Sequence, residues 1–143
     1  MTSIKQHERT FARSQALQVM YQSEVLSIPT KELIETNQLV EENKVLDKYA
    51  LRLLEGVSDK QALLDEKIDS ASENWALDRM PLVDKSLLRL AAFEMIYIDE
   101  VPVSVSINEA VNLAKDFGGE DSPRFVNGIL GRIALLIEGS DNA

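Results

Sequence analysis

The sequence predicts an all-α protein of about seven helices, and its 143 residues suit one domain, residues 1–143. Three observations support this fold class. Apolar residues recur at helical spacing along most of the chain, proline and glycine separate these stretches, and no alternating strand pattern of useful length is present. The apolar fraction of 45% is typical of a globular protein with a buried core.

The N-terminal half contains three predicted helices. Residues 9–26 form the first, and Pro29 interrupts the pattern before a shorter polar helix around residues 33–34. A longer helix follows, with apolar residues at helical spacing: Leu46, Tyr49, Leu53, Val57, Leu64 and Ile68.

The C-terminal half contains the remaining helices. Asn74 is expected to cap a short helical turn over 75–80, which Pro81 ends. Residues 82–98 are apolar on most sides, which is typical of a helix at the centre of a bundle.

Two further helix signals follow Pro102. Ser106-x-x-Glu109 is a candidate capping box in the first turns of the next helix, which stops at Gly118-Gly119. Ser122 is expected to cap the last helix, with Pro123 at its first helical position.

The composition excludes several classes of function. There is no cysteine and only one histidine, His7, which argues against a metal site and against histidine-based or cysteine-based catalysis. No glycine-rich phosphate loop precedes a helix, so no catalytic residue and no cofactor is predicted. No apolar run approaches a membrane span, which makes the cytoplasm the expected location.

The net charge of −9 argues against a protein that coats RNA electrostatically. The acid is unevenly distributed. Residues 1–26 carry three basic and two acidic side chains, whereas residues 27–74 carry six and eleven. Residues 75–95 carry three of each, so the N-terminus and the central segment are the least acidic parts of the chain.

Two sets of basic residues are candidate contacts. Lys5, Arg9 and Arg13 are four residues apart and share one face if the first helix extends back to residue 5, although an ordinary solvated face is the commoner meaning. Arg79 and Lys85 flank a helix junction, where function and solvation are equally expected. Arg89 lies among apolar residues and is expected to pair with an internal carboxylate.

A second cluster lies at the start of the last helix and comprises Asp121, Ser122, Arg124, Phe125 and Asn127. An aromatic ring beside an arginine suits stacking on an unpaired base, and the alternative for Phe125 is a position at the edge of the core. Trp75 is expected to be a core anchor, with a stacking platform as the alternative, whereas Tyr21 suits either the core rim or a contact surface.

Three stretches together resemble the bacterial transcription antitermination factor NusB family. These are Ala12-Arg13-x-x-Ala16-Leu17-Gln18-x-Met20-Tyr21, Asn74-Trp75 through Glu94, and Ile107-Asn108-Glu109-Ala110 through Phe125-Val126-Asn127-Gly128. The similarity covers nearly the whole chain and is weakest over residues 27–45. It implies two perpendicular three-helix bundles.

The resemblance also implies partners and contact residues. The chain would pair with the ribosomal protein NusE to bind boxA-type single-stranded RNA, and would join the RNA polymerase antitermination complex during ribosomal RNA transcription. The implied RNA contacts are Lys5, Arg9, Arg13, Arg79, Lys85, Arg124 and Phe125. The implied partner contacts are Tyr21, Asp84 and Asp121.

The sequence departs from the family at the N-terminus, where an arginine-rich run is thinned to three basic residues. Independent RNA affinity should therefore be weak. Two alternatives remain: an isolated accessory domain, like those fused to RNA cytosine methyltransferases, and a module that self-associates as a homodimer and masks its RNA surface.

Overall fold

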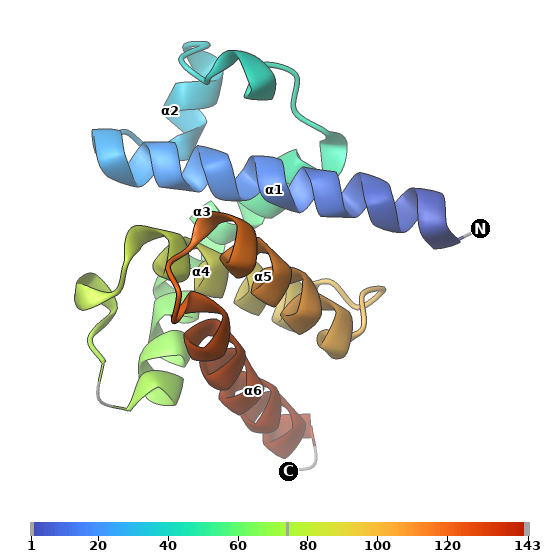
Figure 1. Ribbon diagram of the computed structural model, residues 1–143, viewed down its shortest axis with the longest axis vertical. Helices are drawn as coiled ribbons and strands as arrows, with labels where there is room; N and C mark the ends of the chain where they lie inside the picture. Colours follow the sequence, from blue (N-terminus) through green and yellow to red (C-terminus); the bar gives the residue numbers. More distant parts are fainter. Residues whose placement is uncertain (1, 74, 142–143) are drawn as a thin grey trace. The chain divides into compact units, whose positions relative to one another are not determined.

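The computed structural model describes residues 2–73 and 75–141, with the side chains of residues 8–73 and 75–139. The α-helices are α1 (Thr2–Leu26), α2 (Thr30–Glu35), α3 (Lys48–Ser72), α4 (Leu82–Tyr97), α5 (Val103–Phe117) and α6 (Ser122–Asp141) (Figure 1). Two short 3-10 turns are also present, η1 (Glu41–Asn43) and η2 (Leu77–Arg79). The described residues contain no strand, which confirms the all-α prediction.

The helix count differs slightly from the prediction at the segment after α3. The turn expected over 75–80 is the 3-10 turn η2, and Asn74, its expected cap, lies outside the described residues. Within the described part of the chain, no helix has both the length and the apolar character needed to cross a membrane.

The chain divides into two compact units, residues 1–59 and 60–143. The boundary lies inside α3, so this helix contributes to both units. The single domain and the perpendicular arrangement of two bundles both stay predictions.

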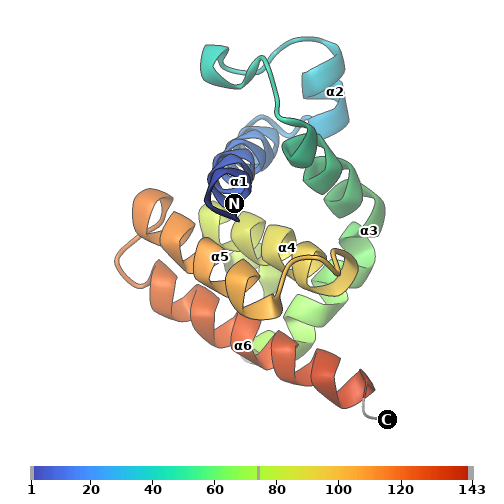
Figure 2. The same cartoon turned by 90° about the vertical axis from the view of Figure 1, so that its right-hand side faces the viewer.

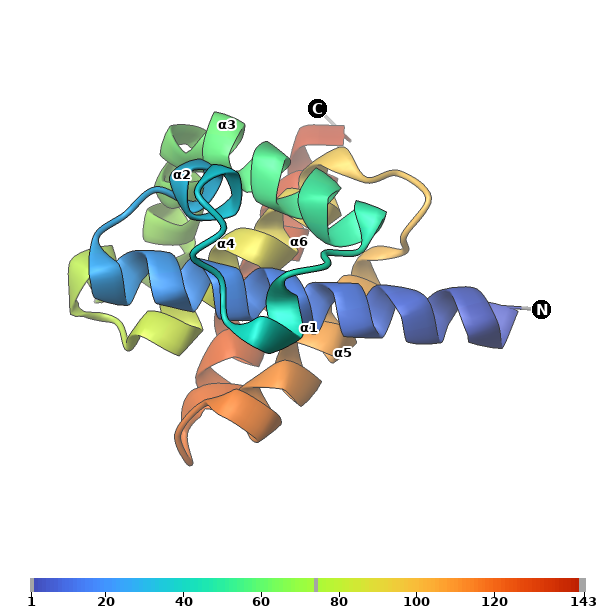
Figure 3. The same cartoon turned by 90° about the horizontal axis from the view of Figure 1, so that it is seen from above.

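The first unit is built on α1, which runs as one unbroken helix (Figure 3). It begins at Thr2, as the basic stripe requires, and ends where Ser27 adopts a left-handed φ of 57°. The Gln15 side chain donates to the Val45 carbonyl and accepts from the Asp47 N–H, each at 3.0 Å. These two bonds hold the segment before α3 against α1. The buried face of α1 includes Ala12, Ala16, Leu17, Val19 and Met20.

In the second unit α4, α5 and α6 pack against one another in pairs (Figure 2). The expected central helix is confirmed, because α4 is buried along most of its length. Arg89 pairs with Asp65 of α3 through Nε–Oδ1 and Nη2–Oδ2 distances of 2.7 and 3.0 Å. This two-point contact confirms the expected internal pair and fixes α4 to the second half of α3.

Two expected helix starts differ from the structure. Ser106 lies inside α5, and its hydroxyl donates to the buried Glu94 Oε1 at 2.6 Å, so the capping-box prediction is wrong. The Asp121 carbonyl accepts the first backbone bond of α6, from the Phe125 N–H at 3.0 Å. Ser122 is therefore the first helical residue and not the cap.

Candidate nucleic-acid interface

The turn between α5 and α6 is unusually tight. A Cβ atom on Gly118 would lie 2.6 Å from both Cβ and Oγ of Ser122 and 2.9 Å from the Ala114 carbonyl oxygen. Real Cβ atoms essentially never approach this closely, so the start of α6 can sit against the end of α5 only because residue 118 is glycine.

Ser122 connects this turn to the start of α4. Its Oγ accepts a hydrogen bond from the Gly119 N–H at 3.0 Å, and its hydroxyl donates to the Asp84 carboxylate. Asp84 lies in the first turn of α4. A short polar chain therefore holds the starts of α4 and α6 and the intervening turn together.

Asp84 lies inside the second unit, with 3% of its surface exposed. Burial raises the pKa of its carboxyl above the usual value of 3.8, and the hydrogen bond from Ser122 opposes this shift without cancelling it. Its Oδ1 atom has no hydrogen-bonding partner among the described residues. Asp84 is therefore placed to hold Ser122 at the start of α6. Its expected contact with a partner protein stays a prediction.

Trp75 and Phe125 form an aromatic pair at this end of the second unit. Their ring centroids are 5.9 Å apart and their planes are inclined by 74°. Trp75 is 52% exposed, so the expected core anchor is wrong, while Phe125 is half-buried. The pair brings together the segment after α3 and the first turn of α6, 50 positions apart in the sequence.

Charged residues lie along the same two segments. Arg79 in η2 and Arg124 in α6 are exposed, and Lys85, in the neighbouring helix α4, is half-buried. Asp78 and Asp121, which are also exposed, accompany them. The second unit therefore contains an aromatic pair, one ring exposed and one half-buried, on segments of mixed charge.

The first unit holds the other predicted residues. The guanidinium carbons of Arg9 and Arg13 lie 4.4 and 5.7 Å from the centroid of the Tyr49 ring. Arg13 is only 5% exposed, so it belongs to the packed part of α1. Tyr21 is 43% exposed and available as a contact surface. The side chain of Lys5 lies outside the described residues, although its backbone belongs to α1.

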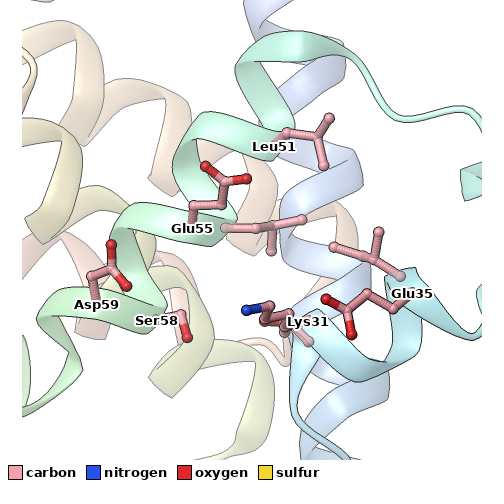
Figure 4. Close-up of a pocket in the computed structure, with 9 residues that line it drawn as sticks. Lys31, Glu35, Leu51, Glu55, Ser58 and Asp59 are labelled. Atoms are coloured by element: carbon pink, nitrogen blue, oxygen red, sulfur yellow. The ribbon is translucent and has the colours of Figure 1, made fainter.

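A hollow of about 370 Å³ also lies in the first unit, between α2 and α3. Lys31 extends from α2 toward α3, which contributes Glu55 and Asp59 (Figure 4). None of the predicted contact residues lines this hollow. Its lining therefore shares no residue with the predicted sites.

Residues 10–135 match the model of the NusB family. The transcription antitermination protein NusB of Bacillus subtilis (strain 168) is 44% identical over 133 residues, which are 93% of this chain and 99% of that protein. The chain belongs to the NusB family. This confirms the predicted family. It also confirms the prediction that the protein is a transcription antitermination factor and not an enzyme.

Solved NusB structures have the same fold. The NusB of T. maritima is 34% identical, with a TM-score of 0.77 over 88% of this chain and 89% of that chain. A crystal structure of the antitermination factors NusB and NusE in complex with double-stranded RNA includes a chain 27% identical, with a TM-score of 0.77. That match covers 89% of this chain and 96% of that one.

The surroundings of Ser122 and Trp75 in this NusB-family protein differ from those that the sequence predicted. Ser122 was expected to cap α6, and its bonds to Gly119 and Asp84 are formed across three elements. The Gly118-Gly119 pair was the available signal, since glycine often marks a close approach. Nothing in the local pattern distinguished an exposed Trp75 from a buried one.

Gly118→Ala should destabilise the protein by about 1–3 kcal/mol, because the added methyl forces Ser122 or the end of α5 to move. Gly128→Ala is the matched control, since nothing lies within 4 Å of its added Cβ. The control should be neutral or stabilising by up to about 1 kcal/mol. Urea unfolding of both variants measures the difference, and equal effects would contradict the close approach.

Asp84→Asn should remove a pH dependence of stability. Because burial raises the pKa of Asp84, the carboxyl stays protonated to a higher pH in the folded state than in the unfolded state. The free energy of unfolding therefore falls as the pH rises from 3.8 through the higher folded pKa. Asparagine keeps an acceptor for Ser122 without the charge. Denaturant unfolding between about pH 4 and about pH 7 should show the variant gaining stability relative to wild type. Parallel profiles for the two proteins would refute this account of Asp84.

Proposed function

We propose that this NusB-family chain binds boxA-type single-stranded RNA as a heterodimer with NusE and acts in antitermination during ribosomal RNA transcription. The complex would operate in the cytoplasm, where it joins other Nus factors on elongating RNA polymerase. Recognition involves no covalent chemistry, so the residues only bind and position.

The observation that carries the RNA proposal is the aromatic pair at the start of α6, made of the exposed Trp75 and the half-buried Phe125. Phe125 and Trp75 are in edge contact, and the exposed Arg124 precedes Phe125 in the chain. Unpaired bases stack on such rings, whereas the bases of a duplex are already stacked on one another. This favours a single-stranded segment as the ligand.

The charge of the chain supports a need for a partner. At −9 the protein repels phosphate at long range, and few cations accompany the aromatic pair. A basic partner such as NusE would supply the missing charge. We assign Tyr21 and Asp121 to the NusE contact because both are exposed, and Asp84 to the support of that surface through Ser122.

The basic stripe of α1 contributes the remaining RNA contacts. Arg9 is half-exposed over Tyr49, while the buried Arg13 packs against the same ring. We therefore assign phosphate contact to Lys5 and Arg9. Arg13 holds Tyr49 beneath Arg9.

Labelled boxA-type RNA should bind tightly only when NusE from the same organism is present, because the acidic chain makes few phosphate contacts alone. Fluorescence anisotropy with and without NusE measures this. For the isolated chain, three or four phosphate contacts give a log–log salt slope of about −2 to −3, at roughly 0.7 per phosphate.

Two results would contradict the proposal. A steep salt slope for the isolated chain would show that it carries its own phosphate-binding surface. Absence of binding under both conditions, with a homodimer in light scattering, would favour the self-associating module instead.

Phe125→Ala should weaken RNA binding by the NusE heterodimer by about 1–3 kcal/mol if a base stacks on this ring. Leu88→Ala is the contrasting variant, because Leu88 is fully buried in α4 and its truncation should cost about 2–5 kcal/mol of stability. RNA affinity and unfolding free energy are measured for each. A Phe125→Ala protein that loses stability but keeps its RNA affinity per folded molecule would exclude stacking.

A further inference from the structure

We infer that Trp75 is a base-stacking platform for single-stranded RNA, with Phe125 as its side wall. This rests on the proposed RNA function and adds a residue that neither the family resemblance nor the comparisons assign. A tryptophan with 52% of its surface in water presents a large apolar ring that a flat ligand can cover.

The backbone of Trp75 is fixed in place although its side chain is exposed. Its N–H donates to the Ser72 carbonyl at 3.1 Å, and its own carbonyl accepts from the Ser72 hydroxyl at 2.8 Å. Ser72, at the end of α3, is buried, and so is Met80, which follows η2. Buried residues therefore lie on both sides of Trp75 in the chain. A ring on a fixed backbone loses little conformational entropy when a ligand binds, which favours a binding role.

Phe125 restricts the indole from a second element. The two rings meet at 74° with their centroids 5.9 Å apart, so they form a corner. A flat base can stack on one ring while its edge contacts the other. The N–H of Phe125 is bonded to the Asp121 carbonyl in the first turn of α6, which fixes the backbone of the side wall as well.

The surrounding charges favour a nucleic-acid base over an ionic ligand. Arg79 and Arg124 are exposed on the two segments and suit a phosphate on either side of the base. Exposed Asp78 and Asp121 oppose any strong attraction of phosphate. Binding here must therefore draw on stacking more than on charge, which is the mode that single-stranded RNA uses.

The test uses the only tryptophan of the chain as its own reporter. Full-length protein, with a tryptophan-free NusE, is titrated with a short unstructured boxA-type RNA. Trp75 emission should be quenched in parallel with the anisotropy of the same RNA carrying a label. Trp75→Ala should weaken binding about five- to a hundred-fold, and Trp75→Phe should restore most of it.

The control variant is Leu135→Ala, which truncates another exposed apolar side chain of the second unit and should leave affinity unchanged. Tight RNA binding with unchanged emission and unchanged Trp75→Ala affinity would overturn the inference while the proposed function stands. Quenching by NusE alone would also overturn it, because the indole would then lie in a protein interface. Absence of RNA binding by wild type would overturn both.

Discussion

The close approach of Ser122 to Gly118, which leaves no room for a Cβ atom at residue 118, positions the start of the last helix, and the candidate interface depends on it. Because residue 118 has no side chain, Ser122 can approach the end of α5 and bond to both Gly119 and Asp84. That position sets the first turn of α6, which contains Arg124 and Phe125 and directly follows Asp121. Phe125 in turn contacts Trp75. The absence of a side chain at residue 118 thus permits the position of the first turn of α6, where Arg124 and Phe125 lie.

Two kinds of polar group have different tasks in the second unit. Arg89 and Asp65 satisfy one another in a two-point ion pair, so they hold α4 to α3 and leave no charge for a ligand. Asp84 is buried with one oxygen unpartnered, and its pKa is raised by burial. Burial therefore disfavours the charged form of Asp84, whose carboxyl contacts Ser122 inside the second unit. The exposed surface relies instead on aromatic rings, because a chain of charge −9 gains little from phosphate attraction.

The sequence predicted the elements better than the environments of their side chains. Helical periodicity predicted the central burial of α4 and the internal pairing of Arg89, because both follow from local spacing. The burial of Asp84 and Arg13 and the exposure of Trp75 depend on which distant segments pack nearby, and no local pattern encodes that. Ser106 illustrates the same limit: its spacing to Glu109 predicted a capping box, yet its hydroxyl bonds to Glu94 on the preceding helix.

The central claim is that RNA binds the second unit at the aromatic pair. The most direct test is a ¹⁵N–¹H NMR spectrum of the labelled chain in its NusE heterodimer, recorded before and after addition of boxA-type RNA. The account predicts the largest shift changes at the Trp75 indole N–H and at the amides of Arg124 and Phe125, with little change around Lys31 in the hollow of the first unit. Changes confined to that hollow, with the Trp75 indole signal unmoved, would contradict it.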